Sequence, residues 1–222
     1  MPVRLRSRRG VSDKQALALL PEARQIATRF PDDPAVLSAL AEAEHDEGND
    51  KEAISAADAA IARDPTQVNA YVQKGYSLFR IAASDADPVA AYTRARQPFL
   101  ELNRLENNHP LPLVYYYLSF LEQKAEPTAT AIAGLKRAAD LAPFDLSLRM
   151  MLARQQVLQK QFAEARASLA PVAFNPHGGV MAAAAQRIIA KIDGDPAWDG
   201  KDFDALAETS GKESAAAPSS AR

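Results

Sequence analysis

The residues that could carry acid–base or metal chemistry are scattered through this chain of 222 residues. Its three histidines, His45, His109 and His177, lie far apart, and none has a partner at the spacing that places two metal ligands on one helical face. The absence of cysteine excludes thiolate zinc sites, disulfides and thiol nucleophiles. We therefore predict no metal site and no cofactor, and interpret the histidines as solvent-exposed residues at helix ends.

Carboxylates, which can act as general acids and bases, gather in one short stretch. The stretch belongs to a single predicted helical hairpin and contains Glu42, Glu44, Asp46, Glu47, Asp50 and Glu52. No glycine-rich phosphate loop and no G-x-S-x-G nucleophile motif accompanies it. We interpret the stretch as a solvated acidic face, with electrostatic docking of a basic partner as the alternative. No catalytic residue is predicted, and the protein is not expected to be an enzyme.

The beginning of the chain is basic, with four arginines at Arg4, Arg6, Arg8 and Arg9. These could contact phosphates or anionic lipid, or fold back on the acidic stretch, but no aromatic residues are interleaved with them, and the net charge of the chain is −2. We predict a flexible basic arm over residues 1–11 and no nucleic-acid partner. No run approaches the roughly 18–20 apolar residues of a membrane span, and none follows the basic start, which predicts a cytoplasmic protein without a signal peptide.

The elements that must position any binding residue are helices, because the chain has 46 alanines and only 7% aromatic residues. Prolines recur at a nearly fixed spacing. Pro65 follows Pro31 by 34 residues, Pro143 follows Pro110 by 33, and Pro176 follows Pro143 by 33. Residues between the prolines repeat as well. One register consists of Leu37, Leu40, Ala41, Ala53, Ala57, Ala60 and Pro65, and a shift of 78 gives Tyr115, Leu118, Ser119, Ala131, Leu135, Ala138 and Pro143.

This pattern resembles the tetratricopeptide repeat (TPR) over residues 12–192. The resemblance implies an all-α fold, a right-handed α-solenoid of antiparallel helix hairpins. In such a hairpin, small residues let the two helices approach closely, here Ala41, Gly75, Ser119 and Ala153 in the first helices. The shift of 78 is two periods plus ten residues, which predicts an insertion in the second repeat.

The predicted boundaries follow from the period. They are a half-repeat at 12–31, repeats at about 34–67, 68–111 with the insertion, 112–145 and 146–177, and a closing helix at 178–193. Within the insertion we expect one long helix with a kink at Pro98. Residues 194–222 lack periodicity and are predicted to be disordered. Trp198, Phe203 and Leu206 are exceptions, which either fold back on the closing helix or form a short partner-binding motif.

The resemblance also implies where a ligand would bind, because first helices line the concave groove of a TPR array. The family's groove-facing offsets select Ser38, Glu42, His45 and Asn69 as candidates. The predicted partner-binding groove itself consists of Gln73, Tyr76, Arg80, Tyr116, Tyr117, Phe120, Lys124, Met150 and Arg154, with Leu113 and Met151 beside it. Aromatic residues, Met and Arg are the types enriched at binding surfaces. Tyr115 takes the family's core position, and a register slip would bury Tyr117 instead.

Two functional hypotheses follow. The leading one is a non-catalytic TPR scaffold that binds a protein or peptide of unknown identity through the concave groove. The alternative is a C-terminal accessory region of a larger, possibly enzymatic bacterial protein, in contact with its own missing upstream domain. The half-repeat, which lacks its first helix, motivates the alternative.

Overall fold

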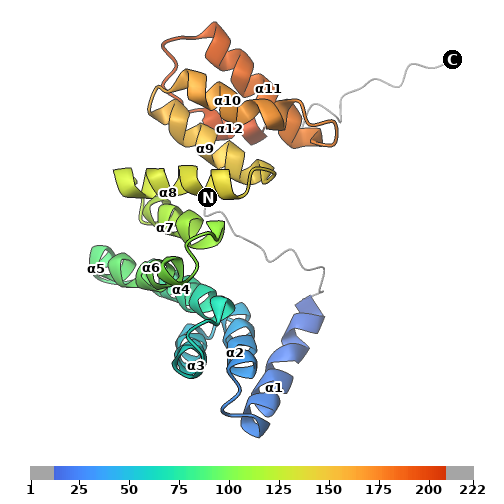
Figure 1. Cartoon of the computed structure of the whole chain (residues 1–222), viewed down its shortest axis with the longest axis vertical. Helices are drawn as coiled ribbons and strands as arrows, with labels where there is room; N and C mark the ends of the chain where they lie inside the picture. The colour runs from blue at the N-terminus through green and yellow to red at the C-terminus, as the bar shows by residue number, and fades with distance from the viewer. Residues whose placement is uncertain (1–12, 209–222) are drawn as a thin grey trace, which may run out of the picture. The chain divides into compact units, whose positions relative to one another are not determined.

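The computed structural model describes residues 13–208, and within them the chain forms twelve α-helices and no strand (Figure 1), which confirms the predicted all-α fold class. The predicted basic arm lies outside the described residues. The helices are α1 (Asp13–Arg29), α2 (Pro34–Asp46), α3 (Asp50–Arg63), α4 (Val68–Ala82), α5 (Pro88–Ala95), α6 (Gln97–Leu105), α7 (Pro110–Glu122), α8 (Ala129–Leu141), α9 (Leu146–Leu158), α10 (Phe162–Ala173), α11 (Gly179–Gly194) and α12 (Phe203–Glu208).

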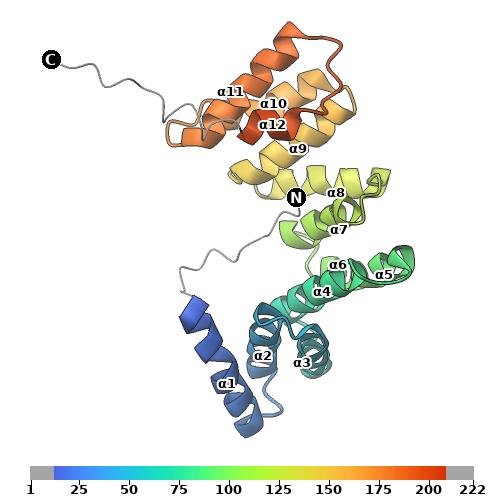
Figure 2. The same ribbon diagram turned by 180° about the vertical axis from the view of Figure 1, so that it is seen from behind.

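The contacts between helices divide the chain after Gly134, within α8, into two compact units. We refer to residues 13–134 as the N-terminal unit and to residues 135–208 as the C-terminal unit. In the N-terminal unit α2 and α3 form a hairpin, α4 packs against both of them, and α1 packs on α2. Helices α5 and α6 follow and lie against α4, and α6 also contacts α7 (Figures 1 and 2).

Local sequence explains where the first helices begin. Asp33 precedes Pro34, and its carboxylate accepts hydrogen bonds from the backbone N–H groups of Ala35 and Val36. A side-chain acceptor before the first turn and a proline at its start are both favourable there, because those N–H groups have no partner within the helix. The same device recurs at α7, where the His109 ring accepts from the N–H of Leu111 and Pro110 opens the helix.

The small residues expected between helices lie in the core. Ala41 of α2 is fully buried against an alanine-rich face of α3. Gly75 of α4 approaches α6 even more closely, since a Cβ atom placed there would lie 2.3 Å from the Phe99 ring. In α8, the predicted buried positions Ala131, Leu135 and Ala138 are all fully buried.

The insertion contains two helices, so the expectation of a single helix kinked at Pro98 is wrong. Helix α5 ends at Ala95 and α6 begins at Gln97, with Pro98 in the first turn of α6. A proline in mid-helix removes a hydrogen bond and clashes with the preceding turn, whereas the first turn tolerates it. Arg96 between the two helices is buried, donates to Ser119 Oγ over 2.7 Å and places its guanidinium 3.9 Å from the centre of the Phe120 ring.

In the C-terminal unit α9 and α10 form a hairpin, and α11 packs against α10 where a closing helix was expected. The expectation of disorder from residue 194 is wrong as far as residue 208. Trp198 and Phe203 are buried in a cluster with Val157 of α9 and Ile188 of α11, and α12 follows. The reason is that two large aromatic rings gain more by burial than the short segment loses in ordering. Residues 209–222 lie outside the described part of the chain.

Candidate partner-binding surface

The first helices of the N-terminal unit carry a row of partly exposed side chains between α2 and α4. Asn69 Nδ2 donates to Glu42 Oε2 over 3.0 Å, and Gln73 Nε2 donates to Asn69 Oδ1 over 3.1 Å. Gln73 is buried, so it positions Asn69 and offers little surface of its own, in contrast to the prediction that it lines the groove. Asn69 and Glu42 remain partly exposed.

Tyr76 continues this row toward α7. Its hydroxyl hydrogen-bonds to the hydroxyl of Tyr115, and the two rings meet edge to face with centroids 4.7 Å apart. Tyr115 also stacks on Phe99 at 5.1 Å, and burial raises the pKa of the Tyr115 hydroxyl above its usual value. The Tyr115 hydroxyl is therefore neutral at physiological pH and can donate and accept hydrogen bonds. We call the surface formed by Glu42, Asn69, Tyr76 and Tyr115 the first-helix face.

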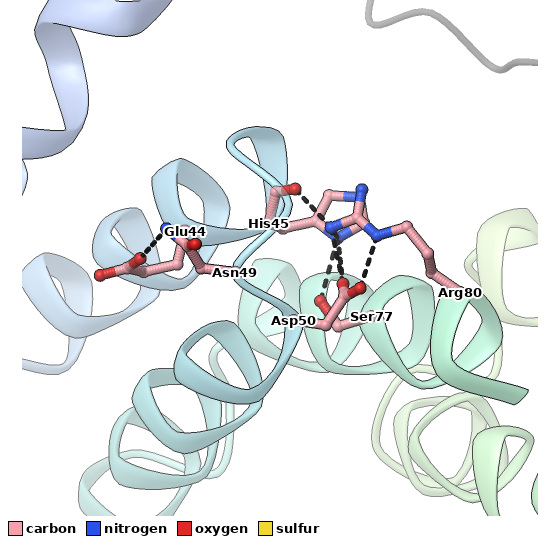
Figure 3. Close-up of polar contacts among 6 residues, drawn as sticks. All are labelled: Glu44, His45, Asn49, Asp50, Ser77 and Arg80. Carbon is pink, nitrogen blue, oxygen red and sulfur yellow. Dashed lines mark hydrogen bonds and ion pairs between the residues drawn. The ribbon is translucent and has the colours of Figure 1, made fainter. Parts of the chain in front are cut away.

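Arg80 lies at the end of α4 and ties it to the turn between α2 and α3 (Figure 3). Its Nε donates to Asp50 Oδ2 over 2.7 Å, its Nη2 lies 2.6 Å from Asp50 Oδ1, and the same Nη2 donates to the carbonyl oxygen of His45 over 2.6 Å. Asp50 thus neutralises the predicted groove cation. Arg80 remains partly exposed, so its outer edge can still face a ligand.

His45 is not the exposed residue expected from sequence. Its ring packs 5.7 Å from Tyr76, and its Nδ1 lies 2.9 Å from Ser77 Oγ (Figure 3). Burial, with the nearby Arg80 guanidinium, lowers the pKa of His45, although Asp50 opposes the shift. The folded protein therefore favours the neutral form of the His45 ring. Sequence reasoning missed this cluster because the partners of His45 come from the following repeat.

Helix α7 is rotated relative to the predicted register. Tyr117 is fully buried and Phe120 is buried beneath Arg96, so both are wrong as groove residues. Tyr116 is partly exposed and packs edge-on against Phe120 at 5.5 Å. Tyr115, assigned to the core, is the tyrosine that reaches Tyr76.

The start of α7 explains this rotation. Pro110 opens α7 as Pro34 opens α2, and these prolines are 76 residues apart, whereas the predicted alignment used 78. Two residues turn a helix by about 200°, which brings Tyr117 and Phe120 into the core, while Ser119 stays fully buried as predicted. The longer connection between Glu122 and Ala129 restores the register in α8. Lys124 lies in this connection, is exposed and adopts a φ of 56°. The proline that opens α7 was the signal that could have found Tyr115.

The predicted groove positions of the C-terminal unit are partly covered by the chain itself. Arg154 of α9 pairs with Asp204 of α12 through two contacts of 2.8 and 2.9 Å, and Met150 packs against the core cluster. Arg187 of α11 donates to the carbonyl oxygen of Leu206 over 2.9 Å. Helices α10 and α12 lie on opposite sides of α9 and α11, with α10 nearer the viewer in Figure 1 and α12 nearer in Figure 2. Met150 and Arg154 are both partly exposed, and Asp204 already pairs with the Arg154 guanidinium.

The described residues contain neither a metal-binding cluster nor a membrane-spanning helix. No group of three or more His, Asp or Glu side chains among them is arranged to hold a metal ion. None of the described helices combines the length and the apolar character needed to cross a bilayer.

Comparison with known proteins identifies the fold. No protein-family model matches the chain, and no curated protein matches its sequence. Solved structures do match: TTC0263, a thermophilic TPR protein of Thermus thermophilus, superposes with a TM-score of 0.59 at 18% identity, over 80% of this chain and 90% of that one. This chain has a TPR-like fold. YrrB, another TPR protein, matches with a TM-score of 0.57 at 16% identity, over 83% of this chain and 90% of YrrB.

A third similar structure is MamA residues 41-end from Desulfovibrio magneticus RS-1, with a TM-score of 0.55 at 18% identity over 69% of this chain and 81% of that one. In TPR-like terms, α2, α4 and α7 are the first helices of three repeats, and α3 is the second helix of the first of them. Helix α1 packs on α2, and the predicted half-repeat would make it the second helix of an earlier repeat.

Proposed function

We propose that this TPR-like protein is a non-catalytic scaffold that binds a protein or peptide ligand through the first-helix face of its N-terminal unit. The observation that carries the proposal is the contrast between equivalent faces. Tyr76 and Tyr115 are partly exposed on α4 and α7, whereas α12 covers α9 and α11 of the C-terminal unit. YrrB is described as a TPR protein with an unusual peptide-binding site, which supports a peptide as the ligand class.

The chemistry of the first-helix face suits a peptide backbone with an apolar or aromatic side chain. The Tyr76 and Tyr115 rings offer rigid apolar area, and their hydroxyls add polar contacts beside it. Asn69 is held by Glu42 and Gln73, so its amide is already oriented before a ligand arrives. Preorganised side chains lower the entropic cost of binding.

Selection from a random peptide library on the immobilised full chain tests the proposal. Peptides that bind should lose about tenfold or more in affinity, or about 1.4 kcal/mol, in the variants Tyr76→Ala and Asn69→Ala. The control is Ala62→Arg, because Ala62 is exposed on α3, away from this face. Circular dichroism must show unchanged helicity. Selected peptides that bind all variants equally would overturn the assignment of this face.

The alternative role, as an accessory region beside an upstream domain, stays a prediction. The absence of catalysis also stays a prediction. Assays of the purified chain with generic ester, phosphate and peptide substrates would test it, and no turnover is expected.

A further inference from the structure

A groove of about 630 Å³ lies between α1 and α2, and it shares Glu42 with the edge of the first-helix face. Its walls are apolar, formed by Leu19, Ala23 and Ile26 of α1 and by Ala35, Val36, Ala39 and Ala43 of α2. Leu19 is 52% exposed and Ile26 is 37% exposed, which is unusual for large apolar side chains at helical spacing on one face.

The next repeat shows what such a groove holds. The residues 34 positions after Leu19, Ala23 and Ile26 are Ala53, Ala57 and Ala60 of α3, and all three are fully buried. Likewise, Val36, Ala39 and Ala43 of α2 correspond to Ala70, Gln73 and Ser77 of α4, which are buried as well.

A helix provides that burial. Helix α2 lies against both α3 and α4, and its Leu37 and Ala41 cluster with alanines of α3 and with Ala70 of α4. Helices α1 and α2 make the corresponding pair one repeat earlier, and the groove between them is the corresponding angle. The repeat geometry therefore points to an α-helix with leucine and alanine on its buried face.

The charge of the groove rim indicates the charge of a helix that would bind there. Four carboxylates line it, Glu22, Glu42, Asp46 and Glu47, and none of its lining residues is basic. Arg24 lies nearby on α1, but Glu44 holds its guanidinium through contacts of 2.7 and 2.8 Å. Like charges across an interface are unfavourable and opposite charges steer association.

We propose that the groove between α1 and α2 is a docking site for a basic amphipathic helix of a partner protein, which binds in the position that α2 occupies against α3 and α4. The basic arm at residues 1–11 matches the charge of the rim, but its sequence contains Pro2 and Gly10 and has only one pair of apolar residues at the spacing of an amphipathic helix, Met1 and Leu5.

Two synthetic helices test the proposal on the full chain. Each has about 16 residues, enough for four turns, with leucine and alanine on one face, and the flanks carry lysine in one peptide and glutamate in the other. Fluorescence anisotropy should show binding of the lysine peptide, with an affinity that falls as salt is added, and binding at least about tenfold weaker for the glutamate peptide. Equal binding of both peptides, or of neither, would overturn the proposal.

Variants locate the site. Ala39 is exposed in the middle of the groove, so Ala39→Arg blocks it while keeping a good helix former, and the lysine peptide should lose about tenfold or more in affinity. The matched control, Ala62→Arg, should bind normally. Glu22→Gln combined with Glu47→Gln should weaken the salt dependence, because it neutralises two of the four rim carboxylates. Retained binding by Ala39→Arg would contradict this location.

Two further outcomes are distinguishable. If deletion of residues 1–11 raises the affinity for the lysine peptide about tenfold, the arm itself fills the groove and the partner helix is the wrong occupant. If Tyr76→Ala abolishes binding of the lysine peptide while Ala39→Arg does not, the peptide binds the first-helix face, and the groove proposal fails without affecting the proposed function.

Discussion

The two units of the chain differ in whether a later segment covers apolar side chains on their helices. In the C-terminal unit, Trp198 and Phe203 follow α11 and are buried among residues of α9 and α11, although Phe174 and Val180 of the same unit are exposed. In the N-terminal unit, Leu19 and Ile26 remain exposed beside α2, and the first-helix face is open as well. A repeat buries its apolar face only when a neighbour stacks on it. The covered face therefore contributes to stability, and the open faces are the ones available to partners.

The largest expected effect comes from removing the cover of the C-terminal unit. Phe203→Ala deletes a buried ring that stacks on Trp198 at 6.3 Å, and a loss of about 3–5 kcal/mol in the free energy of unfolding of this unit is expected. Trp198 is the single tryptophan of the sequence, so its fluorescence during urea unfolding reports this unit alone.

Phe144→Ala is the matched control for this variant, because Phe144 is 93% exposed and its truncation should change stability by less than about 0.5 kcal/mol. Equal destabilisation by the two variants would mean that the C-terminal segment does not form part of the core, and the contrast between the units would disappear.

A smaller effect is expected where α1 is fastened to α2. Arg24→Gln leaves the buried Glu44 carboxylate with Asn49 as its remaining side-chain partner, at 2.8 Å, and should destabilise the N-terminal unit more than the loss of an exposed ion pair does. Arg63→Gln, which breaks the exposed pair with Asp32, should cost less than about 1 kcal/mol. Thermal unfolding followed by circular dichroism measures both, and reversal of this order would show that α1 is not held by the Arg24–Glu44 pair.

The same contact gives the N-terminal unit a dependence on pH. The Arg24 guanidinium lowers the pKa of Glu44 below its usual value, so the unfolded chain takes up this proton first as the pH falls. The stabilisation is therefore complete above the usual glutamate pKa of about 4.3 and is lost as the pH falls through the lower pKa of the folded state.

His45 acts in the same direction at higher pH. Burial lowers its pKa, so folding disfavours the protonated ring and stability should begin to fall as the pH drops below about 6.5. Urea unfolding between pH 7 and pH 5 should show this loss, and the variant His45→Gln should lack it. A loss of equal size in the variant would assign the effect to other groups.

Sequence alone predicted the features that depend on the local pattern. The period located the hairpins, and the alanines at Ala41, Ala53 and Ala60 are buried as their spacing indicated. The rotation of α7 escaped detection because a longer connection to α8 restores the register, so the repeat of the second helices conceals a shift in the first.

Features that depend on distant partners were not predictable from the pattern. Residues 195–208 have no periodicity, and their order comes from contacts with α9 and α11, such as the pair of Arg154 with Asp204. The environment of His45 depends on Ser77 and Arg80 of the next repeat. The open groove followed in part from sequence, since the half-repeat predicted a second helix without its first.

Hydrogen–deuterium exchange of the full chain, alone and with the lysine-flanked helix, tests the contrast between the units most directly. Without peptide, the amides of α1 should exchange faster than those of α3, although both correspond to second helices in the predicted repeats, and residues 203–208 should be protected. The peptide should slow exchange in α1 and α2 and leave α12 unchanged. Equal protection of α1 and α3 without peptide, or a peptide effect confined to α9–α12, would contradict the account.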